Sequence, residues 1–349
     1  MTDEVNFYRA GPRQTYTDIC EILEAKLIPN VIGPPACGKS SLFRKAAAEY
    51  GLFMIDHRVS TSAPEDFSGL PEFKDTPNGR RATFTPFDLF PLVGDEIPKG
   101  YEGWLLFLDE ANSGTKMVQA AMYKLALDGM TGQYHLHDRV MTAMAGNRAS
   151  DRAIVNSFGT AMQSRVITLE MEVVFEEWLY DVALAEQYDE RVIGFLSANP
   201  SFLMDFKPDH NDKTFCAPRT WEFMNKMVKG KEVSAKNTRK FAGTITSGVA
   251  AQFTAFCQIY KSLVTVQQIL SDPENAHVPH EPLHKWGVIA SLMSKIKDDN
   301  FGKMCTYVNR MDTAFKVLFF RTAQVQHPQL RHHPDFIQAA IKLSKYLHG

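Results

Sequence analysis

The stretch Gly33-Pro34-Pro35-Ala36-Cys37-Gly38-Lys39-Ser40 decides the fold class, because it matches G-x-x-x-x-G-K-[ST] at every fixed position. The glycines allow the backbone to curl until several N–H groups point at one anion. A helix that begins near Lys39 adds the positive end of its dipole. The Lys39 ammonium can neutralise outer phosphates, and the Ser40 hydroxyl is a hard oxygen ligand for Mg²⁺. The sequence therefore predicts a phosphate-binding loop whose contacts continue to Ser41.

The residues on both sides of this loop fit a strand, a turn and a helix. Val31-Ile32 reads as a buried strand, and Ser41 to Tyr50 reads as a helix. The alternative is a chance match in an ordinary Gly-Pro loop, which would not require this context. We therefore expect a nucleotide-binding loop.

A second motif, Trp104-Leu105-Leu106-Phe107-Leu108-Asp109-Glu110, is an apolar strand that ends in two acids. The carboxyl end of a parallel strand lies at the ligand crevice of an α/β sheet. Asp109 is then placed to hold Mg²⁺, directly or through water, and Glu110 to polarise an attacking water. The alternative is an acid pair that caps a helix starting near Ser113. Beside a phosphate-binding loop, we favour the catalytic interpretation.

Up to about Glu176, short apolar runs alternate with helical patterns, which predicts a parallel sheet wrapped by helices. After it, apolar residues recur only at helical spacing. The expected fold is therefore a P-loop α/β core with a five-stranded parallel sheet over residues 1–175. An all-helical lid and C-terminal helical region would form 176–349. The predicted strands are Val31-Ile32, Phe53 to Asp56, Leu105 to Leu108, Val140 to Ala145 and Val166 to Leu169. Long helical patterns include Phe241 to Leu263 and Cys305 to Thr322.

The composition is that of a globular protein, with 44% hydrophobic and 22% charged residues among 349. The chain has no apolar run long enough to span a membrane, and Met1 to Arg13 lacks the apolar stretch of a signal peptide. We therefore expect a cytoplasmic protein with no membrane partner. The five scattered cysteines have no metal-ligand spacing and are expected to be reduced and mostly buried.

With these motifs and others in the same order, the chain resembles the AAA+ ATPases, and within them the MoxR-type, dynein-related branch. The resemblance covers roughly residues 15 to 300 and implies an AAA+ core that binds ATP and Mg²⁺. The stretches that carry it are Gly33 to Ser40, Pro64 to Pro71, Leu108 to Asn112, Ala145 to Arg148, Ala161 to Val166 and Ala217 to Trp221.

The resemblance implies roles for polar residues outside the two motifs. Asn147 is similar to sensor 1, which touches the γ-phosphate or the lytic water; on the residues alone, it is equally a turn residue. Arg165 resembles the arginine finger that reaches a neighbouring subunit's nucleotide. Arg152 is a second candidate for that interface, or a solvated loop arginine. Arg219, after Pro218, resembles sensor 2, which couples the lid to the nucleotide, or is a surface arginine.

Two hairpins are expected. Asp66 to Pro91 predicts one that turns at Asn78-Gly79, and Gly132 to Leu136 predicts another. By resemblance, the first is the insertion in helix 2 that faces the pore of a ring, and the second is the insertion before sensor 1. The aromatic residues Phe84, Phe87 and Phe90 would contact a client or pack against the domain, and the sequence leaves both open.

The resemblance implies a self-assembled ring, expected to be a hexamer, that remodels or activates a protein client. It also implies a partner that carries a von Willebrand factor A domain. The alternative is a nucleic-acid-associated motor of the restriction or DNA-processing type. The net charge of −2 and the lack of a dense Lys/Arg stripe weigh against nucleic acid. A scaffold without turnover would not need Glu110, Asn147 and Arg165, and a small-molecule kinase would not need a finger arginine.

Overall fold

The computed structural model describes residues 8–151, 155–209 and 211–347. The chain forms two compact units. The first, which we call the sheet unit, comprises residues 1–173 and 207–209. The second, which we call the helical unit, comprises residues 174–206 and 210–349.

The sheet unit is built on six parallel strands in the order β1-β10-β2-β9-β6-β3. All five predicted strands are present, and a two-residue strand, β1, is added at one edge. Its two residues carry no apolar run, so no pattern indicated it. The strands are β1 (Arg9–Ala10), β2 (Ile28–Gly33), β3 (Leu52–Arg58), β6 (Gly103–Asp109), β9 (Val140–Asn147) and β10 (Val166–Met171).

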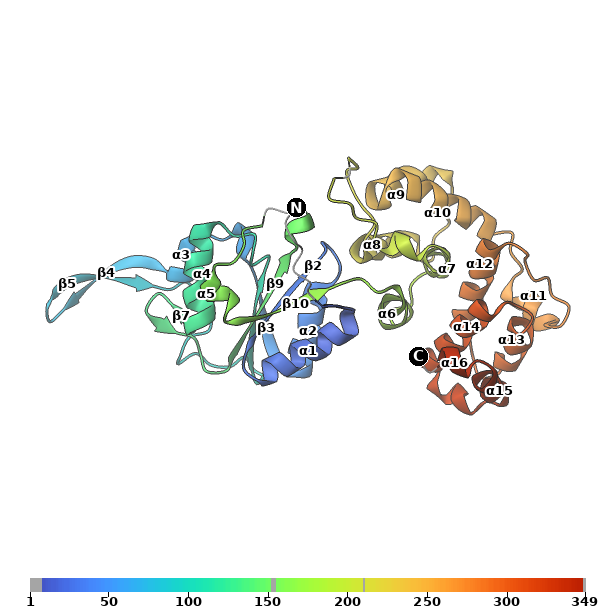
Figure 1. The fold of residues 1–349 in the computed structure, drawn as a ribbon, viewed down its shortest axis with the longest axis horizontal. Coiled ribbons are helices and arrows are strands. Elements are labelled where there is room, and N and C mark those ends of the chain that lie inside the picture. Colours follow the sequence, from blue (N-terminus) through green and yellow to red (C-terminus); the bar gives the residue numbers. More distant parts are fainter. Residues whose placement is uncertain (1–7, 152–154, 210, 348–349) are drawn as a thin grey trace. The chain divides into compact units, whose positions relative to one another are not determined.

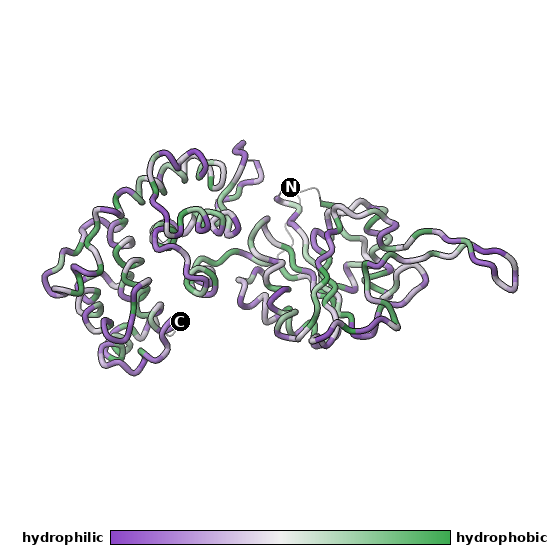
Figure 2. The backbone as a smooth tube through the Cα atoms, turned by 180° about the vertical axis from the view of Figure 1, so that it is seen from behind, coloured by the Kyte–Doolittle hydropathy of each residue, from purple (hydrophilic) through white to green (hydrophobic). Residues whose placement is uncertain are grey.

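Helices cover both faces of this sheet (Figure 1). On one face, Leu105 and Phe107 of β6 pack in a core with residues of α1 (Pro12–Glu24) and α2 (Lys39–Glu49). On the other face, Leu106 and Leu108 pack in a core with residues of α3 (Pro64–Ser68), α4 (Lys116–Asp128) and α5 (Thr160–Gln163). A strand buried on both faces is apolar throughout, which explains the unbroken run in β6. The same strands form the hydrophobic centre of the unit in Figure 2.

Both predicted hairpins are present. Strands β4 (Leu70–Thr76) and β5 (Gly79–Thr85) pair with Thr76 opposite Gly79, so the turn is 77–78 and lies one residue earlier than expected. Figure 1 shows this hairpin extending away from the helices beside it. Of its aromatic residues, Phe73 is 64% exposed, whereas Phe90 beyond the second strand is 4% exposed. The second hairpin is formed by β7 (Met130–Thr131) and β8 (Tyr134–His135).

The helical unit is confirmed as helical, but two predicted stretches are each two helices. The stretch Phe241 to Leu263 breaks at Thr246, whose φ is 74°. The stretch Cys305 to Thr322 breaks at 309–312. The helices are α6 (Phe175–Trp178), α7 (Glu190–Ala198), α8 (Pro218–Val228), α9 (Thr238–Ile245), α10 (Ser247–Tyr260), α11 (Val266–Ser271), α12 (Pro282–Met293), α13 (Phe301–Val308), α14 (Thr313–Gln326), α15 (Pro334–Lys342) and α16 (Ser344–Leu347). A π-helical segment, Leu179–Leu184, follows α6.

The five cysteines are free thiols. Four are buried, namely Cys37, Cys216, Cys257 and Cys305, while Cys20 is partly buried. Burial raises the pKa of Cys216 and Cys257 to about 12 in each case. In the described ranges, every helix is too short or too polar to cross a lipid bilayer.

Candidate nucleotide site

The loop that joins β2 to α2 has the backbone of an anion cradle. Gly38 has φ 104° and Ala36 has φ 59°, both in the left-handed region. Alternation of right- and left-handed residues turns successive N–H groups toward one concavity. Gly38 is needed because a side chain is strained at its φ. The loop ends at Lys39, the first residue of α2, so the positive helix end adds to the cradle.

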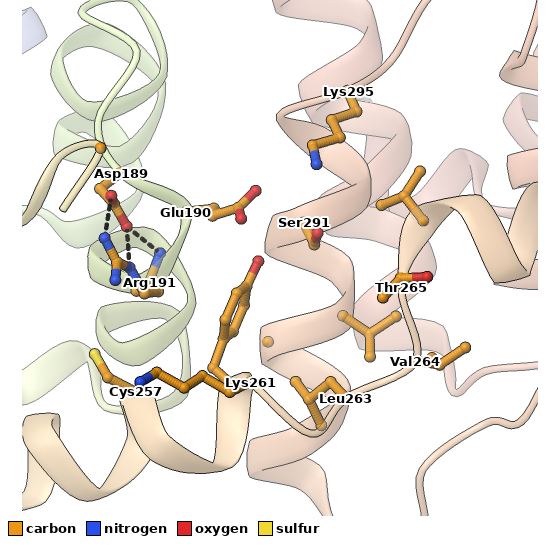
Figure 3. A pocket seen from close by; sticks show the side chains of 15 residues that line it. Asp189, Glu190, Arg191, Cys257, Lys261, Leu263, Val264, Thr265, Ser291 and Lys295 are labelled. Carbon is orange, nitrogen blue, oxygen red and sulfur yellow. Dashed lines mark hydrogen bonds and ion pairs between the residues drawn. The ribbon is translucent and has the colours of Figure 1, made fainter. Parts of the chain in front are cut away.

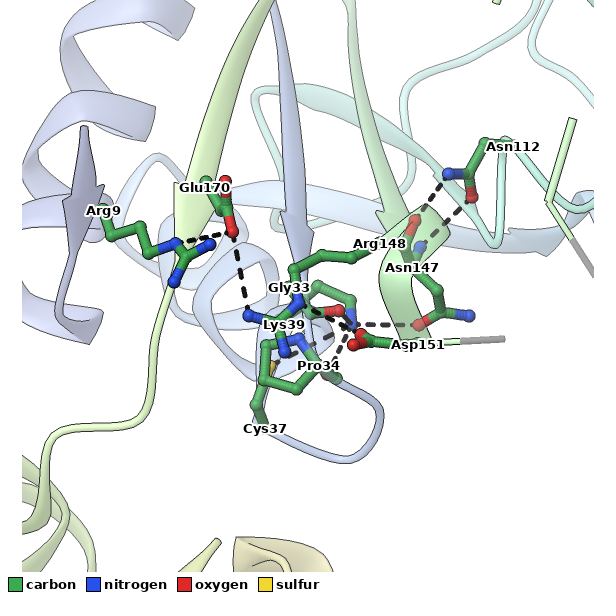
Figure 4. Close-up of polar contacts among 10 residues, drawn as sticks. All are labelled: Arg9, Gly33, Pro34, Cys37, Lys39, Asn112, Asn147, Arg148, Asp151 and Glu170. Atoms are coloured by element: carbon green, nitrogen blue, oxygen red, sulfur yellow. Dashed lines mark hydrogen bonds and ion pairs between the residues drawn. The ribbon is translucent and has the colours of Figure 1, made fainter. Parts of the chain in front are cut away.

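Lys39 is buried, at 8% exposure, and its ammonium is held by the loop itself. The Nζ atom donates to the carbonyls of Gly33 (3.0 Å) and Pro34 (2.9 Å) and to Oδ1 of Asn147 (3.3 Å), as Figure 4 shows. An almost buried cation with neutral partners is suited to an anion that completes its coordination. The structure thus brings together Lys39 and Asn147, two residues predicted for the site.

Ser40 and Asp109 meet from different elements. The Ser40 hydroxyl, on the first turn of α2, donates to Oδ2 of Asp109 at 3.2 Å. The other carboxylate oxygen accepts from the backbone N–H of Glu110 at 2.9 Å, which fixes the plane of the carboxylate. Two hard oxygen ligands side by side, beside a phosphate cradle, fit a Mg²⁺ ion that takes its remaining ligands from phosphate and water.

Glu110 has an unusual backbone conformation, with φ 53° in a residue that is not glycine. Its carboxylate accepts a hydrogen bond from the Ser60 hydroxyl and lies 3.8 Å from Nε of Arg58. Both partners lie at the end of β3 or just after it. The left-handed conformation costs roughly 1 kcal/mol or more, so packing around it must hold it in place. Neither Ser60 nor Arg58 belongs to a sequence motif, so their contact with Glu110 was not predicted.

Asn112 clamps the main chain of Asn147. Its amide Nδ2 donates to the carbonyl of Asn147 at 2.7 Å, and its Oδ1 accepts from the N–H of Asn147 at 3.1 Å. The close approach requires Gly146, because a Cβ there would lie 2.5 Å from Oδ1 of Asn112. The clamp fixes the end of β9, from which the Asn147 side chain reaches Lys39.

A chain of ion pairs lies beside Asn147 (Figure 4). Arg148 lies 3.1 Å from Asp151 and 3.7 Å from Glu170, and Glu170 lies 2.9 Å from Arg9 of β1. Asp151 is 4% exposed in its side chain and Glu170 is 14% exposed, so these pairs are partly shielded from solvent. They connect the residue after Asn147 to the edge strand.

The predicted arginines lie away from this cluster or outside its unit. Arg165 is exposed and precedes β10, whose first residue pairs with Ile28 at the start of β2. It therefore lies about 17 Å along the strands from the P-loop, at the opposite end of the sheet. Arg219 is an exposed residue in the first turn of α8, in the helical unit. Arg152 lies outside the described residues.

No protein-family model matches the chain, and no curated protein matches it. Among solved structures, NtrX from Brucella abortus is similar with a TM-score of 0.35 and 10% identity, over 98% of this chain and 69% of that chain. A protein from Cytophaga hutchinsonii proposed to be an ATPase is similar with a TM-score of 0.36 and 11% identity, over 97% of this chain and 90% of that chain. At this level of similarity, neither structure assigns a function to this chain.

Proposed function

We propose that the chain is an ATP-hydrolysing motor of the AAA+ type, of the MoxR-like branch. The observation that carries this proposal is the convergence of Lys39, Ser40, Asp109 and Asn147. They meet at the carboxyl ends of the adjacent strands β2, β9 and β6 or just beyond them. A triphosphate placed in the P-loop would meet a cation, two metal-ligating oxygens and a polar amide at once.

Each side chain has a physical task in this proposal. The P-loop N–H groups and the Lys39 ammonium hold the phosphates, and Ser40 and Asp109 hold Mg²⁺. Bound Mg²⁺ supplies charge neutralisation at the phosphate oxygens. Glu110 orients the attacking water once its carboxylate leaves Ser60 and Arg58. Asn147 stays fixed by Asn112 and positions the transferred group.

We further propose that hydrolysis requires a ring of this chain. The support is the place of Arg165, which is exposed at the end of the sheet opposite the P-loop. A guanidinium about 17 Å away cannot reach the phosphates of its own chain, so it would act on those of a neighbour. Arg219 is proposed to serve its own nucleotide from the lid.

The proposed substrate of the motor is a protein partner. The exposed β4–β5 hairpin supports this, because it presents Phe73 with the Arg80 guanidinium 5.2 Å from the ring centroid. Aromatic and arginine side chains are enriched where proteins contact each other. A partner that carries a von Willebrand factor A domain rests on the sequence resemblance alone.

The test is steady-state ATP hydrolysis as a function of protein concentration. The wild type is expected to show Mg²⁺-dependent turnover whose specific activity rises as the chain assembles. Arg165→Ala should bind ATP but lose turnover by roughly a thousandfold, the effect of a missing finger. Arg139→Ala, which removes another exposed arginine of the sheet unit, is the matched control and should keep wild-type turnover.

An experiment that mixes two variants distinguishes an active site shared between subunits from one that a substitution has inactivated by misfolding. Arg165→Ala subunits keep an intact Glu110, and Glu110→Gln subunits keep an intact Arg165. A mixture of the two should therefore recover part of the activity that each lacks alone. Turnover that is independent of concentration and indifferent to Arg165→Ala would refute the ring, and absence of ATP binding by the wild type would refute the whole proposal.

A further inference from the structure

The helical unit contains a cavity of about 640 Å³ that plays no part in the proposed nucleotide chemistry. It lies among α7, α10 and α12 and the loop between α10 and α11 (Figure 3). Its volume is within the range of small-molecule sites. All of its lining residues belong to the helical unit, so the cavity does not depend on how the two units meet.

The hydroxyl of Tyr260 is the most informative group in this cavity. It is buried with Glu190 and Ser291 beside it, and makes no hydrogen bond of good geometry to either within the described ranges. Burial and the nearby Glu190 carboxylate raise the pKa of Tyr260, so the hydroxyl keeps its proton and remains a donor. An unpaired buried donor costs about 1–3 kcal/mol, which a ligand acceptor would recover.

Of the charged side chains that line the cavity, one acidic and one basic side chain remain available to a ligand, because the others are paired within the protein. Arg191 is already satisfied by Asp189, at 2.7 and 2.8 Å, and by the carbonyls of Val228 and Lys231. Lys261 is likewise paired, with Glu232 at 2.6 Å.

By contrast, the side-chain ammonium of Lys295 has no hydrogen-bond or ion-pair partner among the described residues, and the Glu190 carboxylate accepts a hydrogen bond from Ser294 at 2.6 Å. Figure 3 shows Glu190 and Lys295 facing the same space, with Ser291 on the neighbouring wall. A simple anion would be repelled by Glu190, and a simple cation by Lys295. A ligand that carries both charges satisfies both.

Part of the wall is aliphatic. Leu263, Val266 and Val288 line the cavity, and Val266 and Val288 are buried. Gly287 lets α12 approach the loop, because a Cβ there would lie 2.6 Å from Cδ1 of Leu263. Aliphatic walls of this kind gain about 25 cal/mol for each Å² of apolar ligand surface that they cover.

We propose that this cavity binds a free aliphatic α-amino acid. The ligand ammonium lies on Glu190, and its carboxylate accepts hydrogen bonds from Tyr260 and Lys295. The aliphatic side chain packs on Leu263, Val266 and Val288. Each of the three parts of the ligand thus meets a part of the cavity with complementary chemistry.

The test is isothermal titration calorimetry of the full chain with L-leucine, which is also repeated with L-valine. L-leucine is expected to bind at one site per chain, and glycine more weakly because it lacks the side chain. L-leucinamide lacks the carboxylate and N-acetyl-L-leucine lacks the ammonium, so each should bind at least tenfold more weakly than L-leucine. If either analogue bound as tightly as L-leucine, the cavity would not require both charged groups, and the ligand would instead be a peptide terminus.

Variants of the cavity residues distinguish a loss of ligand binding from a loss of stability. Tyr260→Phe removes the unpaired hydroxyl, so the chain should unfold at the same or a higher temperature, yet bind L-leucine roughly tenfold more weakly. Glu190→Gln and Lys295→Gln should weaken binding similarly, whereas Glu274→Gln and Lys303→Gln at exposed positions of the same unit should not. Absence of heat with L-leucine and L-valine, or binding unchanged in Tyr260→Phe and Glu190→Gln, would refute the proposal.

Discussion

Replacing Asn112 with alanine tests whether a side chain to which the sequence assigned no role holds the candidate nucleotide site together. The substitution removes two hydrogen bonds to the main chain of Asn147, at 2.7 and 3.1 Å. Each bond contributes about 1 kcal/mol net, so the loss is about 2 kcal/mol. Because β9 lies inside the sheet between β2 and β6, the cost should appear as easier opening of that strand.

Hydrogen–deuterium exchange of a peptide that covers β9 measures this cost. A loss of about 2 kcal/mol should accelerate exchange of its slowest amides roughly 30-fold in Asn112→Ala. Asn112→Asp keeps the acceptor but not the donor, and should give an intermediate or equal effect. Asn78→Ala, in the exposed hairpin turn, is the matched control and should leave β9 unchanged. Exchange in Asn112→Ala at the wild-type rate would show that the clamp does not hold the strand.

Three further predictions concern the same unit. Ser60→Ala should raise ATP turnover about fivefold, because it removes a solvent-exposed hydrogen bond, worth about 1 kcal/mol, that holds the Glu110 carboxylate away from the attacking water. Unchanged turnover would contradict this. Gly146→Ala should lower the urea midpoint by displacing Asn112, at a cost of about 1–3 kcal/mol, and the combination with Asn112→Ala should cost less than the sum of the two. Burial lowers the pKa of His57, so the unfolded chain binds its proton more readily. Stability should therefore fall as the pH drops below about 6.5, and His57→Gln should flatten this slope in urea titrations between about pH 7 and pH 5; equal slopes would argue against the buried ring as the cause.

The fold and the meeting of Ser40 with Asp109 were predictable because their signals are local. The P-loop residues are contiguous, and the strand that ends at Asp109 is apolar in every residue because both faces are covered. The edge strand β1 was not predictable, since two residues carry no periodicity. The break at Thr246 was also hidden, because the apolar spacing continues across it while the backbone turns to a φ of 74°.

The supports of the site could not be found in the sequence. Asn112 acts on a residue 35 positions away, and Ser60 acts on one 50 positions away. Asn, Ser and Arg are common at strand and helix ends, where they have many other uses. Only the sheet order, which places β3, β6 and β9 side by side, brings these side chains to Glu110 and Asn147.

The burial of the thiols makes the chain suited to fluorescent labelling. A maleimide dye reacts with accessible thiolate, so Cys20 is the native cysteine that most needs replacement. With Cys20→Ser as background, Asp75→Cys on the hairpin and Lys303→Cys on the helical unit would each offer an exposed position for a dye. Energy transfer between such a pair would report the distance between the two units before and after ATP is added, and so through the proposed cycle of hydrolysis.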